Sequence, residues 1–439
     1  MSLAQAAVDG AEPDELLRLE VPTTYRAAHT LKDEVGMFGP LPHGTDGVDK
    51  DVRRSIHVGE VPMPELAPDE VLVAVMASAV NYNTVWSAMF EPIPTFAFLE
   101  RLGRQGYWGA RHNLPRHVLG SDCSGVIVRT GATVRHWRAG DRVVVSTAYI
   151  DDQDPIVQHD GMLATDLRAW GFETNFGGLA EFAVVKATQL LPKPRHLSWE
   201  EAACNMLCAS TAYRMLVGSR GSCMKQGDVV LIWGATGGLG AYGVQLVKNG
   251  GGIPVGVVSS ERKAELLHRL GCPYVVDRSA FEHLNDEKAW RRLGAEVRRL
   301  VGEDPHIVFE HTGRETFGAS VYVARKGGSV VTCGSSSGYA HEYDNRHLWM
   351  KLKRIIGSHG ANYQECHEVN RLFSLGMLQP ALSSVYPLDR TGDAARAVQL
   401  NQHIGKVGVL GLAPAEDLGI EDYALRERVG EDAIRLFRS

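Results

Sequence analysis

The run at residues 231–240, Leu-Ile-Trp-Gly-Ala-Thr-Gly-Gly-Leu-Gly, constrains the fold of this 439-residue chain more than any other feature. Its glycines follow an apolar strand and precede an amphipathic helix. Glycine permits a tight turn and a close approach of the backbone to a pyrophosphate, and the helix N-terminus offers free N–H groups to that anion. A purely structural turn would explain the glycines too, but the strand–turn–helix–strand context predicts a dinucleotide site. The candidate residues are Gly234, Thr236, Gly237, Gly238, Leu239 and Gly240.

Strand-like and helix-like segments alternate around this run. The predicted strands cover residues 229–233, 253–258, 274–276, 306–309 and 329–333. The predicted helices cover residues 239–249, 261–270, 289–301 and 316–325. The strands are continuous apolar runs, which is typical of a parallel sheet with helices on both faces. We therefore predict an α/β domain, a Rossmann doubly wound parallel sheet, at residues 200–362.

Residues 56–199 show a different pattern, in which Gly- and Pro-bearing loops separate short β segments. These segments cover residues 70–75, 125–128, 142–145 and 181–185. Such strands indicate an all-β, barrel-like unit. Residues 1–55 are polar and mixed, with a predicted helix at 12–19 and turn residues near 39–47, and we interpret them as an N-terminal extension. Residues 363–439 combine helix and strand patterns with an acidic tail, and most simply return to the β-rich unit.

The end of the second predicted Rossmann strand indicates which dinucleotide is bound. A free ribose 2′-hydroxyl usually meets an Asp or Glu at this point, whereas here Ser259, Ser260, Glu261, Arg262 and Lys263 follow the strand. Hydroxyls and cations suit a 2′-phosphate and favour NADPH. As the first helical residue, Glu261 can instead complement the helix dipole. In the alternative interpretation Ser260 is a helix N-cap and the cations form a solvated face.

Further cofactor residues are predicted outside this turn. In open α/β sheets the ligand lies beyond the carboxyl ends of the strands. Glu310 closes the fourth strand and the loop 333–338 follows the fifth, which places Gly334 and Ser335 near the nicotinamide. Thr211, in an apolar segment before the first strand, is also a candidate.

Charge and apolar content exclude several classes of protein. The net charge is −6 without a basic block, so a nucleic-acid or anionic-membrane partner has no electrostatic support. We find no apolar stretch near the roughly 18 residues of a membrane span and no signal peptide at the N-terminus. Seven scattered cysteines do not form a disulfide framework, which fits a reducing cytoplasm.

Cysteines and histidines do not predict a metal site. No C-x-x-C pair has a partner at structural-zinc spacing. Cys204 and Cys208 lie in an apolar segment and are interpreted as small core residues, and no carboxylate or thiolate pattern accompanies His112 and His117. We therefore expect no catalytic metal.

Longer stretches resemble a known family. They are Trp-Gly-Phe-Glu-Thr-Asn-Phe-Gly-Gly at 170–178, Met-Lys-Gln-Gly-Asp-Val-Val-Leu-Ile-Trp-Gly at 224–234, Phe-Glu-His-Thr-Gly-Arg-Glu-Thr-Phe-Gly-Ala-Ser at 309–320 and Arg-Ile-Ile-Gly-Ser-His at 354–359. From about Tyr25 to Ala413 the chain is similar to the crotonyl-CoA carboxylase/reductase branch of the medium-chain dehydrogenase/reductase superfamily. Where zinc-dependent relatives have Gly-His-Glu, this chain has Gly-Ser-Asp at 120–122, which agrees with a metal-free site.

The resemblance implies a GroES-like β-barrel substrate domain formed by both ends of the chain, with the Rossmann domain between them in sequence. It implies NADPH-driven reduction of a 2-enoyl-CoA with fixation of CO₂, which yields a 2-alkylmalonyl-CoA, in homodimers or homotetramers. Enzymes of this type often supply extender units for polyketide assembly.

The family's catalytic set corresponds to Asn81, Phe172, Glu173 and His359. By the resemblance, the Asn81 carboxamide donates to one CO₂ oxygen. Glu173 and His359 hold an ordered water for the other oxygen, and Phe172 screens the enolate from solvent. The alternatives are that Asn81 is an ordinary loop residue and His359 a core histidine.

Substrate-binding residues are predicted at two places. Near the Rossmann carboxyl-end loops, Arg325, Lys326 and Arg346 offer cations to a CoA phosphate, with Tyr322 close to them, although surface solvation explains the cations too. At the acyl end, Gly360 and Ala164 stand where crotonyl-using relatives have Phe and a bulkier residue. The extra volume predicts longer enoyl chains, on the order of six to eight carbons.

Two other functions remain open at this stage. A plain enoyl-CoA or quinone reductase of the same superfamily would keep the glycine turn but would not need the four catalytic residues. A non-catalytic NADPH-binding protein, like some lens crystallins of the superfamily, is a more distant alternative.

Overall fold

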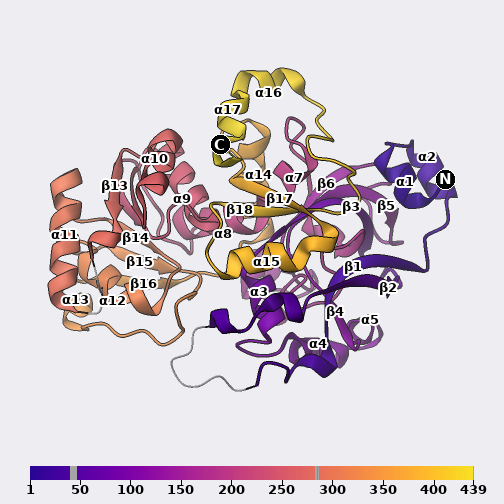
Figure 1. Cartoon of the computed structure of the whole chain (residues 1–439), viewed down its shortest axis with the longest axis horizontal. Helices are drawn as coiled ribbons and strands as arrows, with labels where there is room; N and C mark the ends of the chain where they lie inside the picture. Colours follow the sequence, from indigo (N-terminus) through magenta and orange to yellow (C-terminus); the bar gives the residue numbers. More distant parts are fainter. Residues whose placement is uncertain (40–46, 282–283, 285, 439) are drawn as a thin grey trace. The chain divides into compact units, whose positions relative to one another are not determined.

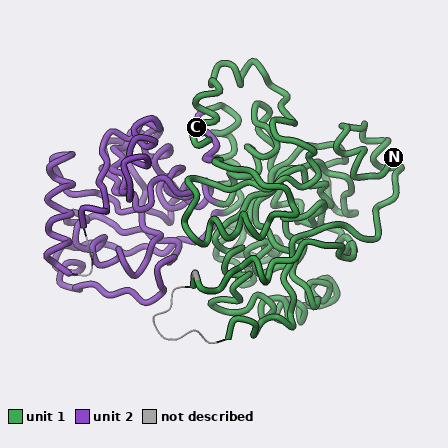
Figure 2. Tube along the Cα trace, viewed as in Figure 1, with its two compact units in different colours: residues 1–207, 362–376, 382–438 green, residues 208–361, 377–381, 439 purple. Residues whose placement is uncertain are grey.

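The computed structural model describes residues 1–39, 47–281, 284 and 286–438, so the turn predicted near residues 39–47 falls almost entirely outside the described residues. Two compact units are present (Figure 2). Unit 1 contains residues 1–207, 362–376 and 382–438, and unit 2 contains residues 208–361 and 377–381. The start that we predicted for the second domain, residue 200, thus moves to Cys208.

Unit 2 contains a six-stranded sheet in the order β13-β12-β11-β14-β15-β16, and every pair is parallel. The strands are β11 (Val229–Ile232), β12 (Ile253–Val258), β13 (Tyr274–Asp277), β14 (Ile307–Glu310), β15 (Ser329–Thr332) and β16 (Arg354–Gly357). The strand order reverses between β11 and β14, the switch point at which such sheets bind their ligands. The predicted Rossmann fold is confirmed.

Helices cover both faces of this sheet, with α9 and α10 on one side and α11 and α12 on the other (Figure 1). The helices of unit 2 are α8 (Met206–Leu216), which begins at the end of unit 1, α9 (Gly238–Asn249), α10 (Glu261–Leu270), α11 (Glu287–Val301), α12 (Arg314–Val323) and α13 (Arg346–Trp349). Local signals set their ends: the Asp286 side chain caps α11, and Gly302 ends it with a φ of +87°. The predicted elements from residue 229 to 333 all end within two residues of the observed ones.

Unit 1 is built on a sheet in the order β10-β6-β5-β3-β18-β17, with β9 also paired to β3. Its strands are β3 (Glu70–Val80), β5 (Cys123–Thr130), β6 (Arg142–Val145), β9 (Phe182–Lys186), β10 (Leu190–Pro192), β17 (Leu382–Pro387) and β18 (Lys406–Leu410). A two-stranded sheet joins β7 (Ala148–Tyr149) to β8 (Arg168–Ala169). Because β18 pairs antiparallel with β3, the C-terminal segment does return to the β-rich unit.

The N-terminal residues are part of unit 1, which corrects our interpretation of residues 1–55 as an extension. Strand β1 (Thr24–Leu31) lies between β2 (His57–Pro62) and β4 (Arg116–Val118). Its sequence, Thr-Tyr-Arg-Ala-Ala-His-Thr-Leu, mixes polar residues with alanine and therefore has a weak strand signal.

The helices of unit 1 flank these sheets. They are α1 (Leu3–Val8), α2 (Pro13–Arg18), α3 (Tyr82–Met89), α4 (Thr95–Gly103), α5 (Tyr107–Ala110), α6 (Val157–Asp160), α7 (Trp199–Ala203), α14 (Tyr363–Ser374), α15 (Thr391–Gln399), α16 (Tyr423–Val429) and α17 (Glu431–Ile434). Within the described ranges, no helix combines the length and the apolar character that a membrane crossing requires.

Candidate active site

The predicted dinucleotide turn joins β11 to α9. Gly234 has a left-handed φ of +54°, and its carbonyl oxygen accepts from the N–H of Gly237 (2.9 Å). A Cβ on Gly240 would lie 2.8 Å from the Cα of Ala235 and closer still to the carbonyl oxygen of Gly234, so no side chain fits there. Helix α9 has no side-chain cap, which leaves its first N–H groups for an anion. These residues fit a dinucleotide pyrophosphate.

A buried carboxylate fixes the loop that follows β14. Glu310 is inaccessible and accepts from the N–H groups of Thr312 (2.7 Å) and Gly313 (3.0 Å) and from the hydroxyl of Ser320 (2.6 Å). Burial raises the pKa of this carboxyl and lowers the pKa of the neighbouring His311. His311 Nε2 lies 2.8 Å from the carbonyl oxygen that precedes Gly234 in the chain, which ties this loop to the glycine turn.

The residues at the end of β12 have the geometry of a helix start. The Ser260 hydroxyl accepts from the N–H of Lys263 (3.4 Å), so the N-cap interpretation of Ser260 holds. Ser259 is exposed, and the half-buried Lys263 has a pKa lowered by burial. Glu261 is the first residue of α10, as expected. A role for Ser259 and Lys263 in binding a 2′-phosphate remains a prediction.

The other predicted cofactor residues lie in unit 2 as well. Thr211 is buried in α8. Gly334 and Ser335 follow β15 and are half-buried, and the Ser335 hydroxyl lies 2.6 Å from Nε2 of His341. Their contact with a cofactor stays a prediction.

In unit 1, buried polar groups hold the loop 170–178. The Asn175 side chain accepts from the N–H of Val118 (2.8 Å) and donates to the carbonyl oxygens of His112 (3.1 Å) and Arg116 (2.8 Å). The carbonyl oxygen before Asn175 lies 3.1 Å from Nε2 of His117. Burial lowers the pKa of His112 to about 3 and of His117 to about 4. Both histidines are therefore neutral supports of the loop, a role that sequence reasoning missed.

Two glycines of the same loop pack directly on the segment 120–122. A Cβ on Gly171 would lie 2.6 Å from the carbonyl carbon of Gly120 and closer still to its oxygen, and Gly171 has a left-handed φ of +68°. A Cβ on Gly178 would lie 2.6 Å from the carbonyl oxygen of Asp122. We call this contact of Gly171 and Gly178 with residues 120–122 the glycine interlock.

The interlocked loop presents Phe172 and Glu173. The Phe172 ring lies 6.4 Å from the Trp86 ring and 6.0 Å from the Phe98 ring, between centroids, so three aromatic side chains gather here. One Glu173 carboxylate oxygen accepts from the N–H of Ala169 (2.8 Å), which orients the side chain within its own turn. The site roles predicted for Phe172 and Glu173 are untested by these contacts.

Asn81 lies at the junction of β3 and α3 and is buried. Its amide nitrogen donates to Oδ2 of Asp122 (2.8 Å), and its amide oxygen accepts from Lys406. Sequence reasoning named Asn81 but not its two charged partners. A chain distance of 284 residues separates Asp122 from Lys406, so no local pattern links them.

The remaining site candidates belong to different units. Ala164 is buried after a 3₁₀ turn of unit 1, and Gly360 has a left-handed φ of +52° in unit 2. His359 follows β16 and is exposed, which excludes the interpretation as a core histidine. Arg325 and Lys326 precede β15 and thus lie at the amino ends of the strands. Our placement of these two cations near the carboxyl-end loops was wrong.

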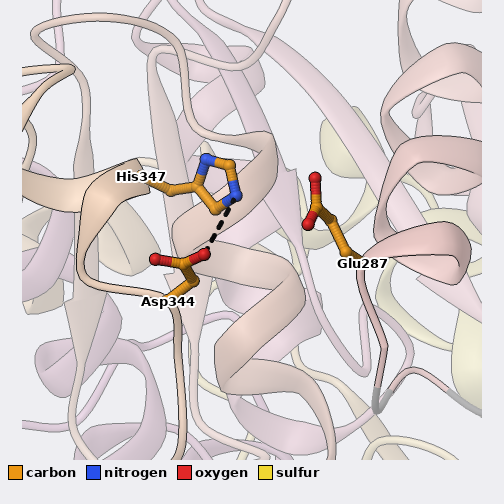
Figure 3. Close-up of side chains that lie close together, drawn as sticks. All are labelled: Glu287, Asp344 and His347. Atoms are coloured by element: carbon orange, nitrogen blue, oxygen red, sulfur yellow. Dashed lines mark ion pairs between the residues drawn. The ribbon is translucent and has the colours of Figure 1, made fainter.

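Arg346 and Tyr322 lie beside a cluster of possible metal ligands. Glu287, Asp344 and His347 have ligand atoms within 4.8 Å of one another, the one such group among the described residues (Figure 3). Arg346 donates to both oxygens of Asp344, and Arg291 donates to Glu287 (2.6 Å). The arginines already compensate both carboxylates, and Glu287 begins α11, where the helix dipole favours an anion. We assign no metal to this cluster.

Comparison with known proteins identifies the superfamily. A family model of the alcohol dehydrogenase GroES-like domain matches residues 67–195, and one of zinc-binding dehydrogenases matches residues 238–374. A GroES-like part combined with a Rossmann part defines a medium-chain dehydrogenase/reductase. Zinc does not fit at Asp122, because the ammonium group of Lys406 lies 3.0 Å from the carboxylate and already occupies the place of a cation beside it.

Full-length relatives identify the branch. The chain is 55% identical over 429 residues to the crotonyl-CoA reductase of Streptomyces collinus, covering 96% of this chain and 95% of the relative. It is 36% identical to the crotonyl-CoA carboxylase/reductase of Cereibacter sphaeroides, covering 88% and 92%. The solved structure of the 2-octenoyl-CoA carboxylase reductase CinF with NADP and 2-octenoyl-CoA matches with a TM-score of 0.96 and 58% identity, over 100% and 99% of the two chains. This chain belongs to the crotonyl-CoA carboxylase/reductase family, as its sequence predicts.

Proposed function

We propose that this protein is an NADPH-dependent enoyl-CoA carboxylase/reductase that converts a medium-chain 2-enoyl-CoA, of hexenoyl or octenoyl type, into a 2-alkylmalonyl-CoA. The observation that carries the proposal is the full-length similarity to CinF, whose structure is a complex with NADP and 2-octenoyl-CoA. The glycine turn of unit 2 supplies the fitting pyrophosphate site.

The proposed reaction is balanced without a proton. NADPH, when bound, supplies a hydride to the β carbon of the enoyl thioester, and the electron pair of the double bond moves into an enolate. The α carbon of that enolate attacks CO₂ to form a carbon–carbon bond and a carboxylate, and NADP⁺ is left. A proton that reached the α carbon first would give the merely reduced acyl-CoA, so the site must exclude water.

Four side chains are assigned to this step. Asn81 donates an N–H to one CO₂ oxygen, because a carboxamide is a neutral donor suited to an uncharged ligand. Phe172, with Trp86 beside it, keeps water from the enolate. Glu173 and His359 hold an ordered water that donates to the second CO₂ oxygen.

Cofactor and substrate contacts complete the assignment. The turn residues from Gly234 to Gly240 hold the pyrophosphate, and Ser259 with Lys263 holds the 2′-phosphate. Thr211, Gly334 and Ser335 are assigned to the cofactor as well. For the CoA moiety, Tyr322 and Arg346 remain candidates, while the location of Arg325 and Lys326 at the amino ends of the strands gives them no support.

A second candidate is a non-carboxylating enoyl-CoA reductase. The relatives from Streptomyces collinus and Streptomyces avermitilis are named crotonyl-CoA reductases, without the word carboxylase. The two functions differ only in what reaches the α carbon of the enolate.

One experiment separates the candidates. NADPH oxidation is measured with enoyl-CoAs of increasing chain length, with and without labelled bicarbonate, and the thioester product is analysed by mass spectrometry. We expect one labelled carbon for each NADPH oxidised, and the fastest turnover with six- to eight-carbon chains. Oxidation of NADPH without label in any product would leave the plain reductase.

We further propose that the protein is a cytoplasmic homo-oligomer, a dimer or tetramer. Strand β16 is exposed at the end of the six-stranded sheet, and edge strands tend to pair with another chain. Trp349, Met350 and Leu352 nearby are exposed apolar side chains. Light scattering compares Ile355→Lys, which is expected to be monomeric, with the wild type and so tests the assembly.

The proposed location in the cytoplasm is supported by the cysteines. All seven are free thiols, which suits a reducing compartment.

A further inference from the structure

Lys406 and Asp122 form an ion pair inside unit 1. Their side chains are 3% and 0% exposed, and Nζ of Lys406 lies 3.0 Å from Oδ2 of Asp122. Charges at such depth persist only where hydrogen bonds satisfy them. Lys406 also donates to the carbonyl oxygen of Val80 (3.2 Å) and to the side-chain oxygen of Asn81. Oδ1 of Asp122 accepts from the backbone N–H of Leu207 (2.9 Å).

This pair determines the orientation of the Asn81 amide. An ammonium group only donates, and a carboxylate only accepts. The amide oxygen therefore faces Lys406, and the amide nitrogen donates to Asp122 (2.8 Å). A flipped amide would place its oxygen against the carboxylate and its NH₂ group against the ammonium. Only one orientation of the Asn81 amide therefore satisfies both Lys406 and Asp122.

The position of Asn81 in the chain gives independent support. Asn81 occupies the N-cap of α3, where asparagine is favoured because its side chain can accept from an N–H of the first turn. Helix α3 nevertheless has no side-chain cap. The amide is directed to the ion pair and not to the helix, although capping would be its ordinary use.

We propose that Lys406 and Asp122 are positioning residues for carboxylation, which act through Asn81. They hold the NH₂ group of Asn81, which has two hydrogens, in one orientation toward the reacting CO₂. Lys406 also draws electron density toward the amide oxygen, which makes the amide N–H groups stronger donors. This inference rests on the proposed function, because it takes Asn81 as the donor to CO₂.

The test measures the ratio of carboxylated to merely reduced product at a fixed bicarbonate concentration. We expect Lys406→Met to lower this ratio roughly tenfold, less than the roughly 100-fold loss typical of removing a catalytic donor, which Asn81→Leu would show. Because Lys406→Met leaves a buried carboxylate unpaired, the charge-balanced variant Lys406→Met/Asp122→Asn is measured as well. It is expected to lower the ratio to a similar extent.

The product ratio separates positioning from folding, because a smaller folded fraction reduces both products equally. Arg426→Met is the matched control, since Arg426 and Glu201 form another buried ion pair of unit 1 (2.7 Å, side chains 5% and 1% exposed). This control is expected to lower the melting temperature and to leave the ratio unchanged.

Three results would overturn the proposal. An unchanged ratio in folded Lys406→Met and in the double variant would reduce the pair to a structural element. Failure of both variants to fold would lead to the same conclusion. Absence of labelled carbon in the wild-type product would overturn the proposed function together with this inference. Because that result is seen in the wild type, it is distinguishable from a failure of this inference alone, which is seen only in the variants.

Discussion

The glycine turn of unit 2 and the amide site of unit 1 achieve a defined geometry in opposite ways. In the turn, the backbone itself is the binding surface, and Gly240 leaves no room for a single added carbon. At the amide site, side chains from three distant parts of the chain, Asn81, Asp122 and Lys406, hold one another by charge and hydrogen bonding. The first site depends on glycines that have no side chain, and the second depends on buried charges and hydrogen bonds that compensate one another.

This difference determines how each site should respond to change. A backbone-built site should fail sterically when an atom is added, whatever the pH or the charge of the protein. A site built from buried polar side chains should respond to protonation and to the loss of a partner. Four predictions test this contrast.

The largest effect is expected for Gly240→Ala in the backbone-built turn. Its methyl group would overlap the carbonyl oxygen of Gly234 and displace the turn. Overpacking of this kind costs about 3 kcal/mol, which corresponds to a roughly 100-fold rise in the Kd for NADPH. Fluorescence titration of NADPH measures it. The control is Gly243→Ala in the same helix, whose Cβ would make ordinary contacts of 3.5 Å with the Phe309 ring. Equal Kd values for both variants would contradict the steric account.

The second prediction concerns pH and the buried histidines of unit 1. His112 and His117 have folded pKa values of about 3 and about 4, below the ordinary 6.5. Below about pH 6.5 only the unfolded chain takes up protons at these groups, so stability falls with pH by about 1.4 kcal/mol per unit for each histidine, until the folded pKa is reached.

The variant His117→Gln isolates one of these contributions. Glutamine can donate to the same carbonyl oxygen without titrating. In urea unfolding between about pH 6.5 and 4.5, its stability should fall less steeply than that of the wild type by about 1.4 kcal/mol per pH unit. Parallel curves for the two proteins would mean that His117 is not held neutral.

The third prediction tests a site defined by missing side-chain volume. Gly360→Phe should lower turnover of octenoyl-CoA roughly tenfold more than turnover of crotonyl-CoA. The phenyl ring would displace about two methylenes of the longer acyl chain from the pocket, and each buried methylene contributes ~0.8 kcal/mol to binding. Since Gly360 has a φ of +52°, any side chain there adds backbone strain. Gly360→Ala has the strain without the ring and is the control. If both substrates slow equally in Gly360→Phe, the pocket assignment is wrong.

The smallest effect is expected for Ser259→Asp at the ribose end of the cofactor site. Ser259 is exposed, so the new carboxylate would repel a 2′-phosphate through solvent-screened charge alone. We expect the preference for NADPH over NADH to fall roughly fivefold, about 1 kcal/mol. Ser259→Ala removes the hydroxyl without adding charge. A preference that stays the same in both variants would leave Ser259 without a role in cofactor choice.

Local sequence was enough to predict most of unit 2. Its strands are short apolar runs that alternate with helices, and the signals for these elements are local, as for α10 between Ser260 and Gly271. The exposed edge strand β16 was missed because it lacks the apolar run of the central strands. The glycine turn was predicted residue by residue because its signal, like those of the helices and central strands, lies within the turn itself.

Unit 1 was predicted less well, because its determinants are pairs far apart in the chain. Asn175 and His112 are separated by 63 residues, and the local sequence around either residue does not predict its contact with the other. The resemblance to a family named Asn81 and Phe172, but neither the ion pair behind Asn81 nor the aromatic partners of Phe172. Strand β1 was missed because tertiary pairing, and not its own composition, makes it a strand.

The glycine interlock has a practical consequence for protein engineering. Because a Cβ on Gly171 or Gly178 would overlap the main chain of residues 120–122, the loop with Phe172 and Glu173 can be exchanged only for a loop that also has glycine at both positions. A chimera with a larger residue at either position would have to displace residues 120–122. Laboratory recombination should therefore yield active progeny only from loops that keep both glycines.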